Sequence, residues 1–186
     1  MQLDLGSHVK TSDGEDIGTV SRIIFDTDKL MVREFVVHEG VLLTHDRIVH
    51  RELVDRIDDD HVVYLKMTAS DADDLPAFVA EQHMPIYISD LHYVDTPKIV
   101  TTPGSVPRDA VVLSHGSEVY DSADKHIGHL DEIVYDDEGV SSAFIVDSGF
   151  FFTHDVVVPV EAIKSIAHGR IDLKITADEA EAAREE

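Results

Sequence analysis

The chain has 186 residues and a formal net charge of −23, because 38 acidic residues outnumber 15 basic ones. A field of this sign repels phosphate backbones and anionic lipid, so the composition argues against direct nucleic-acid binding and favours a basic protein partner. The sequence contains no cysteine, which excludes disulfides, thiolate metal ligands and cysteine nucleophiles.

Membrane and export signals are also missing from the sequence. No apolar run approaches the roughly 20 residues that span a bilayer, and the first residues lack the basic and apolar regions of a signal peptide. We therefore expect a cytoplasmic protein without membrane insertion. Hydrophobic residues make up 43% of the chain, which is enough for packed cores rather than a disordered chain.

The sequence contains an internal repeat. Leu5–Ala69 aligns with His115–Ala177, and matched motifs keep the same order in both copies. Thr44-His45-Asp46, for example, recurs as Thr153-His154-Asp155. A repeat of this kind fixes the architecture, because each copy must form the same small unit.

Each copy is predicted to be a series of short strands separated by turns. The first copy begins with a strand at Val9–Thr11, a tight turn at Asp13-Gly14 and a long strand over Ile17–Asp26. Gly18 and its counterpart Gly128 lie inside the long strand, where glycine is typical of a bulge or a sharp bend. Further strands are expected at 32–38, 41–44 and 62–67, and in the second copy at 142–147, 150–153 and 170–175. Short strands without a long helix between them indicate a compact barrel or sandwich.

A short helix is expected after the last strand of each copy. In the first copy, Thr68 or Ser70 is positioned to cap a helix over Asp71–His83. In the second, a capping-box pattern at residues 176–179 opens a helix-favouring stretch over residues 177–184.

These elements together predict a mainly β protein with two small β-barrels in tandem, each followed by a short α-helix. The first barrel and its helix take residues 1–84, and the second barrel and its acidic C-terminal helix take residues 111–186. Residues 85–110 contain several prolines and form the predicted connector.

The order of these motifs resembles the PRC-barrel family, which occurs in the H subunit of the photosynthetic reaction centre and in a ribosome maturation factor. The resemblance covers most of both copies and rests on the stretches Leu5–Val9, Asp13–Val20, Ile23–Asp26 and Val158–Val160. It implies a small β-barrel with a short helical addition, and it implies no catalytic residues. We do not carry over the membrane anchor of the reaction-centre subunit, since no apolar stretch here would serve as one.

The chain has 12 histidines, and two of them occupy the equivalent pairs His45-Asp46 and His154-Asp155. Imidazole and carboxylate together are a common ligand set for zinc or nickel, and histidine also responds to pH. The simpler interpretation is a polar turn after the fourth strand, so we assign no metal site. His126 and His129 form a second close pair, but residues three apart in a strand point to opposite faces and would not chelate one ion.

Motifs of the common enzyme classes do not occur in this sequence. It has no P-loop, no dinucleotide-binding glycine fingerprint, no nucleophile elbow and no metalloprotease helix signature. We therefore expect no catalytic residues and no cofactor, and we interpret the chain as a protein-binding or scaffold module. A small-ligand, metal or pH sensor that uses the His-Asp positions is the second interpretation, and an unrecognised enzyme is the third.

The main candidate for a working surface is apolar. Phe150, Phe151 and Phe152 are consecutive in a predicted strand, so at least one of them faces away from its own core. Leu42 and Leu43 are likewise consecutive in a predicted strand of the first copy, so one of them faces away from the core. Either the following helix or the connector covers these side chains, or they form a contact between barrels, a homodimer seam or a partner site. We predict intramolecular pairing of the barrels with approximate two-fold symmetry, centred nearer Phe151 than Leu42.

Overall fold

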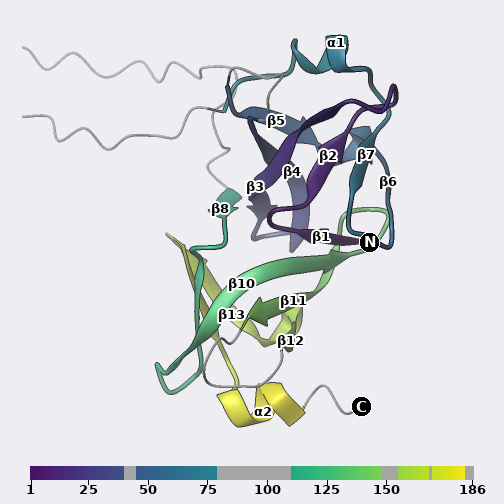
Figure 1. Cartoon of the computed structure of the whole chain (residues 1–186). Helices are drawn as coiled ribbons and strands as arrows, with labels where there is room; N and C mark the ends of the chain where they lie inside the picture. The colour runs from purple at the N-terminus through teal and green to yellow at the C-terminus, as the bar shows by residue number, and fades with distance from the viewer. Residues whose placement is uncertain (40–44, 79–109, 148–154, 168, 183–186) are drawn as a thin grey trace, which may run out of the picture.

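A computed structural model describes residues 1–39, 45–78, 110–147, 155–167 and 169–182 of the chain. These residues form two β-sheets, each curled into a half-barrel and each accompanied by a small helix (Figure 1). One half-barrel is built mainly from the first copy of the repeat and the other mainly from the second. The predicted mainly β class with two tandem units is confirmed.

The strands of the first copy lie in the order β5-β4-β3-β2-β7-β6, and β2 and β7 run parallel whereas the other neighbours are antiparallel. A 3-10 turn, η1 (Arg51–Leu53), connects β5 to β6. The strands are β2 (His8–Lys10), β3 (Asp16–Asp26), β4 (Met31–Glu39), β5 (Arg47–His50), β6 (Val54–Ile57) and β7 (Val63–Leu65).

The second copy repeats this topology strand for strand. Its order is β12-β11-β10-β9-β14-β13, with β9 and β14 parallel and a 3-10 turn, η2 (Val160–Ala162), between β12 and β13. The strands are β9 (Glu118–Tyr120), β10 (His126–Tyr135), β11 (Ser141–Asp147), β12 (Val156–Pro159), β13 (Ile163–Ala167) and β14 (Arg170–Leu173). The two copies therefore share one fold, as the sequence repeat requires.

The predicted bulge in the long strand is confirmed at the same place in both copies. Gly18 pairs with Val9, and Gly128 pairs with Val119, and in each case the residue before the glycine has no opposite number in the ladder. The φ angles of these glycines are 135° and 156°, which side chains rarely adopt. Each long strand consequently has one extra residue near its beginning, and the alternation of its side chains shifts there.

The first helix is shorter than the sequence predicted. It is α1 (Ala69–Ala72), and Thr68 caps it in a capping box with Asp71. The predicted continuation through residues 73–78 is wrong. Pro76 carries no N–H and disfavours a helical residue before it, and the chain then runs beside β5, where Ala77 pairs with Arg47.

The second helix, α2 (Ala177–Ala182), begins where the sequence placed it. The Thr176 backbone N–H donates to Glu179 Oε2 at 2.8 Å, and the Glu179 backbone N–H donates to Thr176 Oγ1 at 3.3 Å, so the capping box is present. None of the helices in the described ranges combines the length and the apolar character that crossing a membrane requires.

The two halves exchange one strand each. β1 (Gln2–Asp4), from the N-terminus, pairs with β10 of the second half, and β8 (Ala110–Leu113) pairs with β3 of the first half. The registers correspond: Leu3 lies opposite Ile133, and Leu113 lies opposite Ile23. The local sequence patterns predict neither segment as a strand. In Figure 1 both short strands lie where the half-barrels meet.

The exchanged strands close the larger hydrophobic core, which spans both halves. Leu3, Phe25, Leu113 and Phe144 are fully or almost fully buried and belong to one cluster. The rings of Phe25 and Phe144, one from each copy, meet edge to face with centroids 5.4 Å apart. The halves are therefore parts of one packed body rather than separate domains on a linker.

Candidate functional site

The His-Asp pairs singled out in the sequence are only partly described. His45 is exposed, and Asp46 accepts a hydrogen bond from His38 Nδ1 at 2.7 Å and from the Arg22 guanidinium at 3.3 Å. Asp46 thus joins strands β4 and β3 to the start of β5. In the second copy Asp155 is exposed. The remaining sequence candidates, His154, Leu42, Leu43, Phe150, Phe151 and Phe152, lie outside the described residues.

His126 and His129, predicted to point to opposite faces of a strand, lie side by side. Their ring centroids are 5.0 Å apart, with the rings edge to face. The reason is the bulge at Gly128: one extra residue between the histidines restores them to the same face of β10. The prediction that these two side chains cannot act together is therefore wrong.

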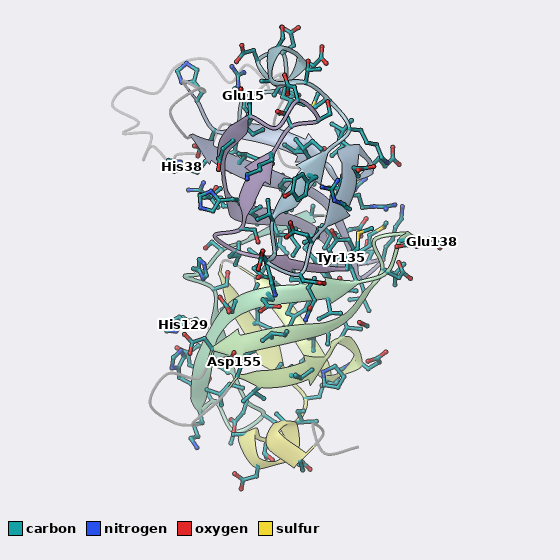
Figure 2. All side chains as sticks on the ribbon, turned by 45° about the vertical axis from the view of Figure 1, so that its right-hand side comes forward. Glu15, His38, His129, Tyr135, Glu138 and Asp155 are labelled. Carbon is teal, nitrogen blue, oxygen red and sulfur yellow. The ribbon has the colours of Figure 1, made fainter. Side chains whose placement is uncertain are left out.

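Glu118 completes this cluster from the neighbouring strand β9. It lies opposite His129 in the β9–β10 ladder. One carboxylate oxygen of Glu118 and one imidazole nitrogen from each histidine all lie within 4.8 Å of one another. Glu118 and His129 are exposed, and His126 is half-buried. Figure 2 shows His129 at the outer edge of the second half-barrel. We call Glu118, His126 and His129 the Glu-His-His cluster.

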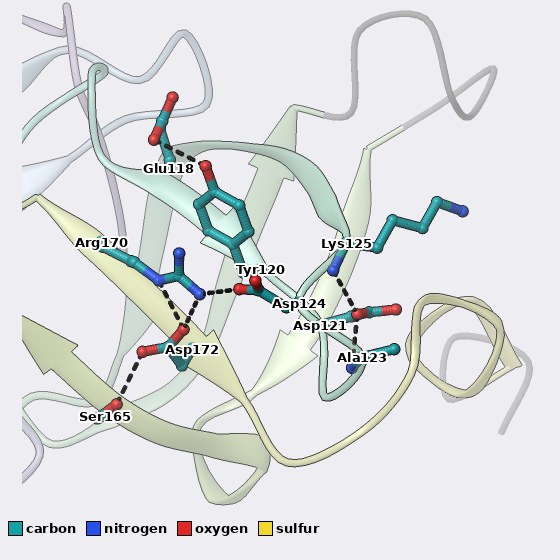
Figure 3. Close-up of polar contacts among 9 residues, drawn as sticks. All are labelled: Glu118, Tyr120, Asp121, Ala123, Asp124, Lys125, Ser165, Arg170 and Asp172. Atoms are coloured by element: carbon teal, nitrogen blue, oxygen red, sulfur yellow. Dashed lines mark hydrogen bonds and ion pairs between the residues drawn. The ribbon is translucent and has the colours of Figure 1, made fainter.

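A row of polar side chains, Tyr120, Arg170, Asp124 and Asp172, adjoins Glu118 of the Glu-His-His cluster (Figure 3), and we call it the supporting row. The Tyr120 hydroxyl donates to Glu118 Oε2 at 3.1 Å, and its ring meets His126 edge to face at 5.3 Å. The Arg170 guanidinium stacks on the Tyr120 ring, 3.8 Å from its centroid. Arg170 is held in turn by Asp124 and by Asp172, the latter at 2.7 Å. The Tyr120 ring thus contacts both Arg170 and His126.

The electrostatics of this row follow from the same contacts. The hydrogen bond to Glu118 raises the pKa of the Tyr120 hydroxyl, because it stabilises the protonated phenol. The hydrogen bond from Arg170 lowers the pKa of Asp172, and the hydrogen bonds to Asp124 and Asp172 raise the pKa of Arg170. The charge of Arg170 is therefore balanced by two carboxylates.

The first copy has a different set of side chains at the equivalent positions. His8 occupies the place of Glu118, Asp16 that of His126 and Thr19 that of His129, since His8 lies opposite Thr19 in the ladder. His8 Nδ1 lies 2.9 Å from Asp16 Oδ2, an exposed ion pair. The bulged backbone is thus common to both copies, but the Glu-His-His cluster belongs to the second.

A second cluster of titratable groups lies at the junction of the halves. Asp4 on the exchanged strand β1 lies directly opposite Glu132 on β10. His61, in the β6–β7 turn, forms an ion pair with Asp4. The three side chains are half-buried and bring one ligand atom each within 4.8 Å of the others. We call Asp4, His61 and Glu132 the junction cluster.

Two carboxyl groups opposite each other in a sheet repel when both are ionised. Burial, and then the charge of Asp4, raise the pKa of Glu132 to about 7. The neighbouring Asp131 also has a raised pKa because it is partly buried. The junction cluster therefore holds a proton that an isolated glutamate would release.

Two segments of the chain match a known family. The family model for the PRC-barrel domain matches residues 5–69 and residues 115–180. The chain belongs to the PRC-barrel family. The matched segments coincide with the two copies of the repeat, so the resemblance seen in the sequence is confirmed and the chain is a tandem PRC-barrel protein. No curated protein matches this chain in sequence.

A local sequence pattern could have predicted the pairing of the histidines in the Glu-His-His cluster, but none predicts the junction cluster. The glycine inside the long strand of each PRC barrel already indicated a bulge, and in the second copy this glycine is Gly128. A bulge counts as one extra residue, which would have placed His126 and His129 on one face. No comparable signal links positions 4, 61 and 132, because they meet only through the exchange of β1 between the two PRC barrels.

Proposed function

We propose that this tandem PRC-barrel protein is non-catalytic and acts as a protein-binding or scaffold module. The observation that supports this is the reciprocal exchange of β1 and β8, through which each barrel completes the other's sheet. A shared core of this kind holds the surfaces of the two barrels at a fixed spacing and orientation. That is what a scaffold needs, because a pre-organised surface loses less freedom on binding than two mobile domains do.

In this proposal the two barrels pair within one chain with approximate two-fold symmetry. The corresponding registers of the exchanged strands support the symmetry. So does the pair of backbone bonds that crosses between the β3–β4 and β10–β11 turns. The Val32 N–H donates to the Gly139 carbonyl at 2.9 Å, and the Ser141 N–H donates to the Leu30 carbonyl at 2.8 Å. Equivalent surfaces on two barrels related by this symmetry suit a binding partner that itself has two similar contact regions.

The net charge of −23 favours a partner with a basic surface. The test is affinity capture from native cell extract on the immobilised full chain, at low and at high salt, beside an unrelated acidic protein of similar size and charge. We expect a small set of proteins that the full chain retains at low salt, high salt releases and the acidic control does not retain. Capture of the same proteins by the control, or of none by the full chain, would overturn the proposal.

A second candidate function is pH sensing, and the junction cluster favours it. Protonation of Glu132 acts directly on the pairing of β1 with β10, because its carboxyl lies opposite Asp4 in that ladder. A change in protonation there would alter the contact between the barrels rather than a remote surface loop. The pH dependence of the free energy of unfolding, compared between the unaltered chain and E132Q, tests it.

A further inference from the structure

We propose that Glu118, His126 and His129 bind one divalent transition-metal ion of the zinc, nickel or cobalt type. The proposal does not depend on the scaffold function above. It rests on the kind of ligand atoms in the cluster, on the way the fold brings them together, and on the side chains that hold them.

The ligand set selects this class of ion. Two imidazole nitrogens and one carboxylate oxygen suit zinc, nickel and cobalt, whereas magnesium and calcium take mostly oxygen ligands. The three ligand atoms lie within 4.8 Å of one another. Bond lengths of about 2.0–2.2 Å then require only a small closing movement of exposed side chains. Three protein ligands leave a further position open, and it faces solvent here because Glu118 and His129 are exposed.

The fold builds the cluster on rigid backbone. Glu118 and His129 are opposite residues of paired strands, and the bulge at Gly128 adds His126 on the same face. His126 Nε2 is buried and has no hydrogen-bond partner in the described structure. Strand residues hold a site more closely than loop residues do, so little entropy is lost when the ion binds.

The supporting row acts on the carboxylate ligand. Tyr120 donates to Glu118 Oε2 and thereby orients the carboxylate, while Arg170 stacks on the Tyr120 ring and is itself held by Asp124 and Asp172. Partners of this kind, one step removed from the ion, commonly change metal affinity 10–100-fold when they are removed. The overall acidity of the chain adds a general attraction for cations.

The first barrel provides an internal comparison. It has the same bulge, but the equivalent positions hold His8, Asp16 and Thr19, and His8 is already paired with Asp16 at 2.9 Å. A threonine in place of the second histidine removes one good ligand for this class of ion. The site should therefore belong to the second barrel alone among the two equivalent positions.

The experiment is a titration of the untagged full chain with Co²⁺, followed by visible absorption, and with Zn²⁺, followed by calorimetry. We expect one ion of high affinity per chain. H126Q and H129Q should each weaken binding at least tenfold, and Y120F should weaken it about tenfold. The matched control H8Q, at the position equivalent to Glu118, should leave the affinity unchanged. Circular dichroism of each variant checks the fold.

A measurement on the unaltered chain tests the proposal even if the variants fail to fold. In NMR spectra, the imidazole signals of His126 and His129 should shift on addition of one equivalent of Zn²⁺, before those of other histidines. The proposal is overturned if the chain binds no Zn²⁺, or if H8Q reduces binding as much as H126Q. It is also overturned if the signals of other histidines shift first or all shift together, because the ion would then be distributed over the surface.

Discussion

Glu132 has two titratable side chains beside it, Asp4 from β1 and His61 from the β6–β7 turn, and Asp131 is its neighbour in β10. Its pKa is about 7 in the fold, against an ordinary 4.5. Since the folded value is the higher one, the protonated carboxyl stabilises the fold. This contribution is complete below about pH 4.5 and is lost as the pH rises through about 7.

We therefore expect the free energy of unfolding to contain a contribution from Glu132 that falls by about 1–2 kcal/mol between pH 5 and pH 8, after allowance for solvent screening. Urea denaturation at the two pH values measures it. E132Q should flatten this part of the profile, whereas E138Q, which alters an exposed turn residue, should not. An unchanged pH profile in E132Q would remove the basis for pH sensing.

At the residue scale, the sequence shows which residues could act as ligands, but it does not show which of their side chains lie next to each other in the fold. The twelve histidines were visible at once, yet the structure joins Asp46 to His38 rather than to the adjacent His45. Adjacent residues in an extended chain point in different directions, so a His-Asp dipeptide says little about which groups meet. His126 and His129 meet because of a backbone irregularity, and Glu118 reaches them only through strand pairing.

At the scale of elements, β2, β3, β4, β7 and their counterparts in the second copy could be predicted, because each has a local pattern and a turn at its end. The strands β5, β6, β12 and β13 were not predicted: the fourth strand had been placed at 41–44 and 150–153, which lie outside the described residues. The long strands, their bulges and the capping box before α2 all follow from residues close together in the sequence. β1 and β8 could not be predicted in this way. Each has only three or four residues, and each is stabilised by a strand of the other copy, which no local pattern reveals. The length of α1 was overestimated because Pro76 ended it and pairing with β5 took over.

The exchanged strands lead to a prediction with two matched variants. Leu3 on β1 and Leu113 on β8 are both fully buried and occupy equivalent places in the two ladders. L3A and L113A should each lower the free energy of unfolding by about 2–5 kcal/mol. Hydrogen exchange should show lost protection in the opposite half: in β10 for L3A, and in β3 for L113A.

The control for this pair is V157A, since Val157 on β12 is 36% exposed and should change stability by less than about 0.5 kcal/mol. If L3A affected only the first barrel, or L113A only the second, the exchanged strands would contribute little to the junction. Chemical denaturation and hydrogen exchange together separate these outcomes.

At the scale of the whole molecule, a net charge of −23 on one compact body makes the folded state repel itself. Added salt screens this repulsion, with a Debye length of about 10 Å at 0.1 M. We expect the melting temperature to rise as NaCl is increased from near zero. Calorimetry across that range measures the effect, and KCl serves as the control for a specific effect of sodium. A flat or falling melting temperature would show that the charges are compensated locally.

The reciprocal strand exchange also has a consequence for synthesis on the ribosome. The edge of β3 that receives β8 stays uncovered until residues 110–113 have been made, and β1 has no partner until β10 emerges. An open strand edge is a template for pairing with other chains. The N-terminal half must therefore stay incomplete until Leu113 has been made, and a nascent chain stalled before residue 110 would be the species most exposed to chaperones and to aggregation.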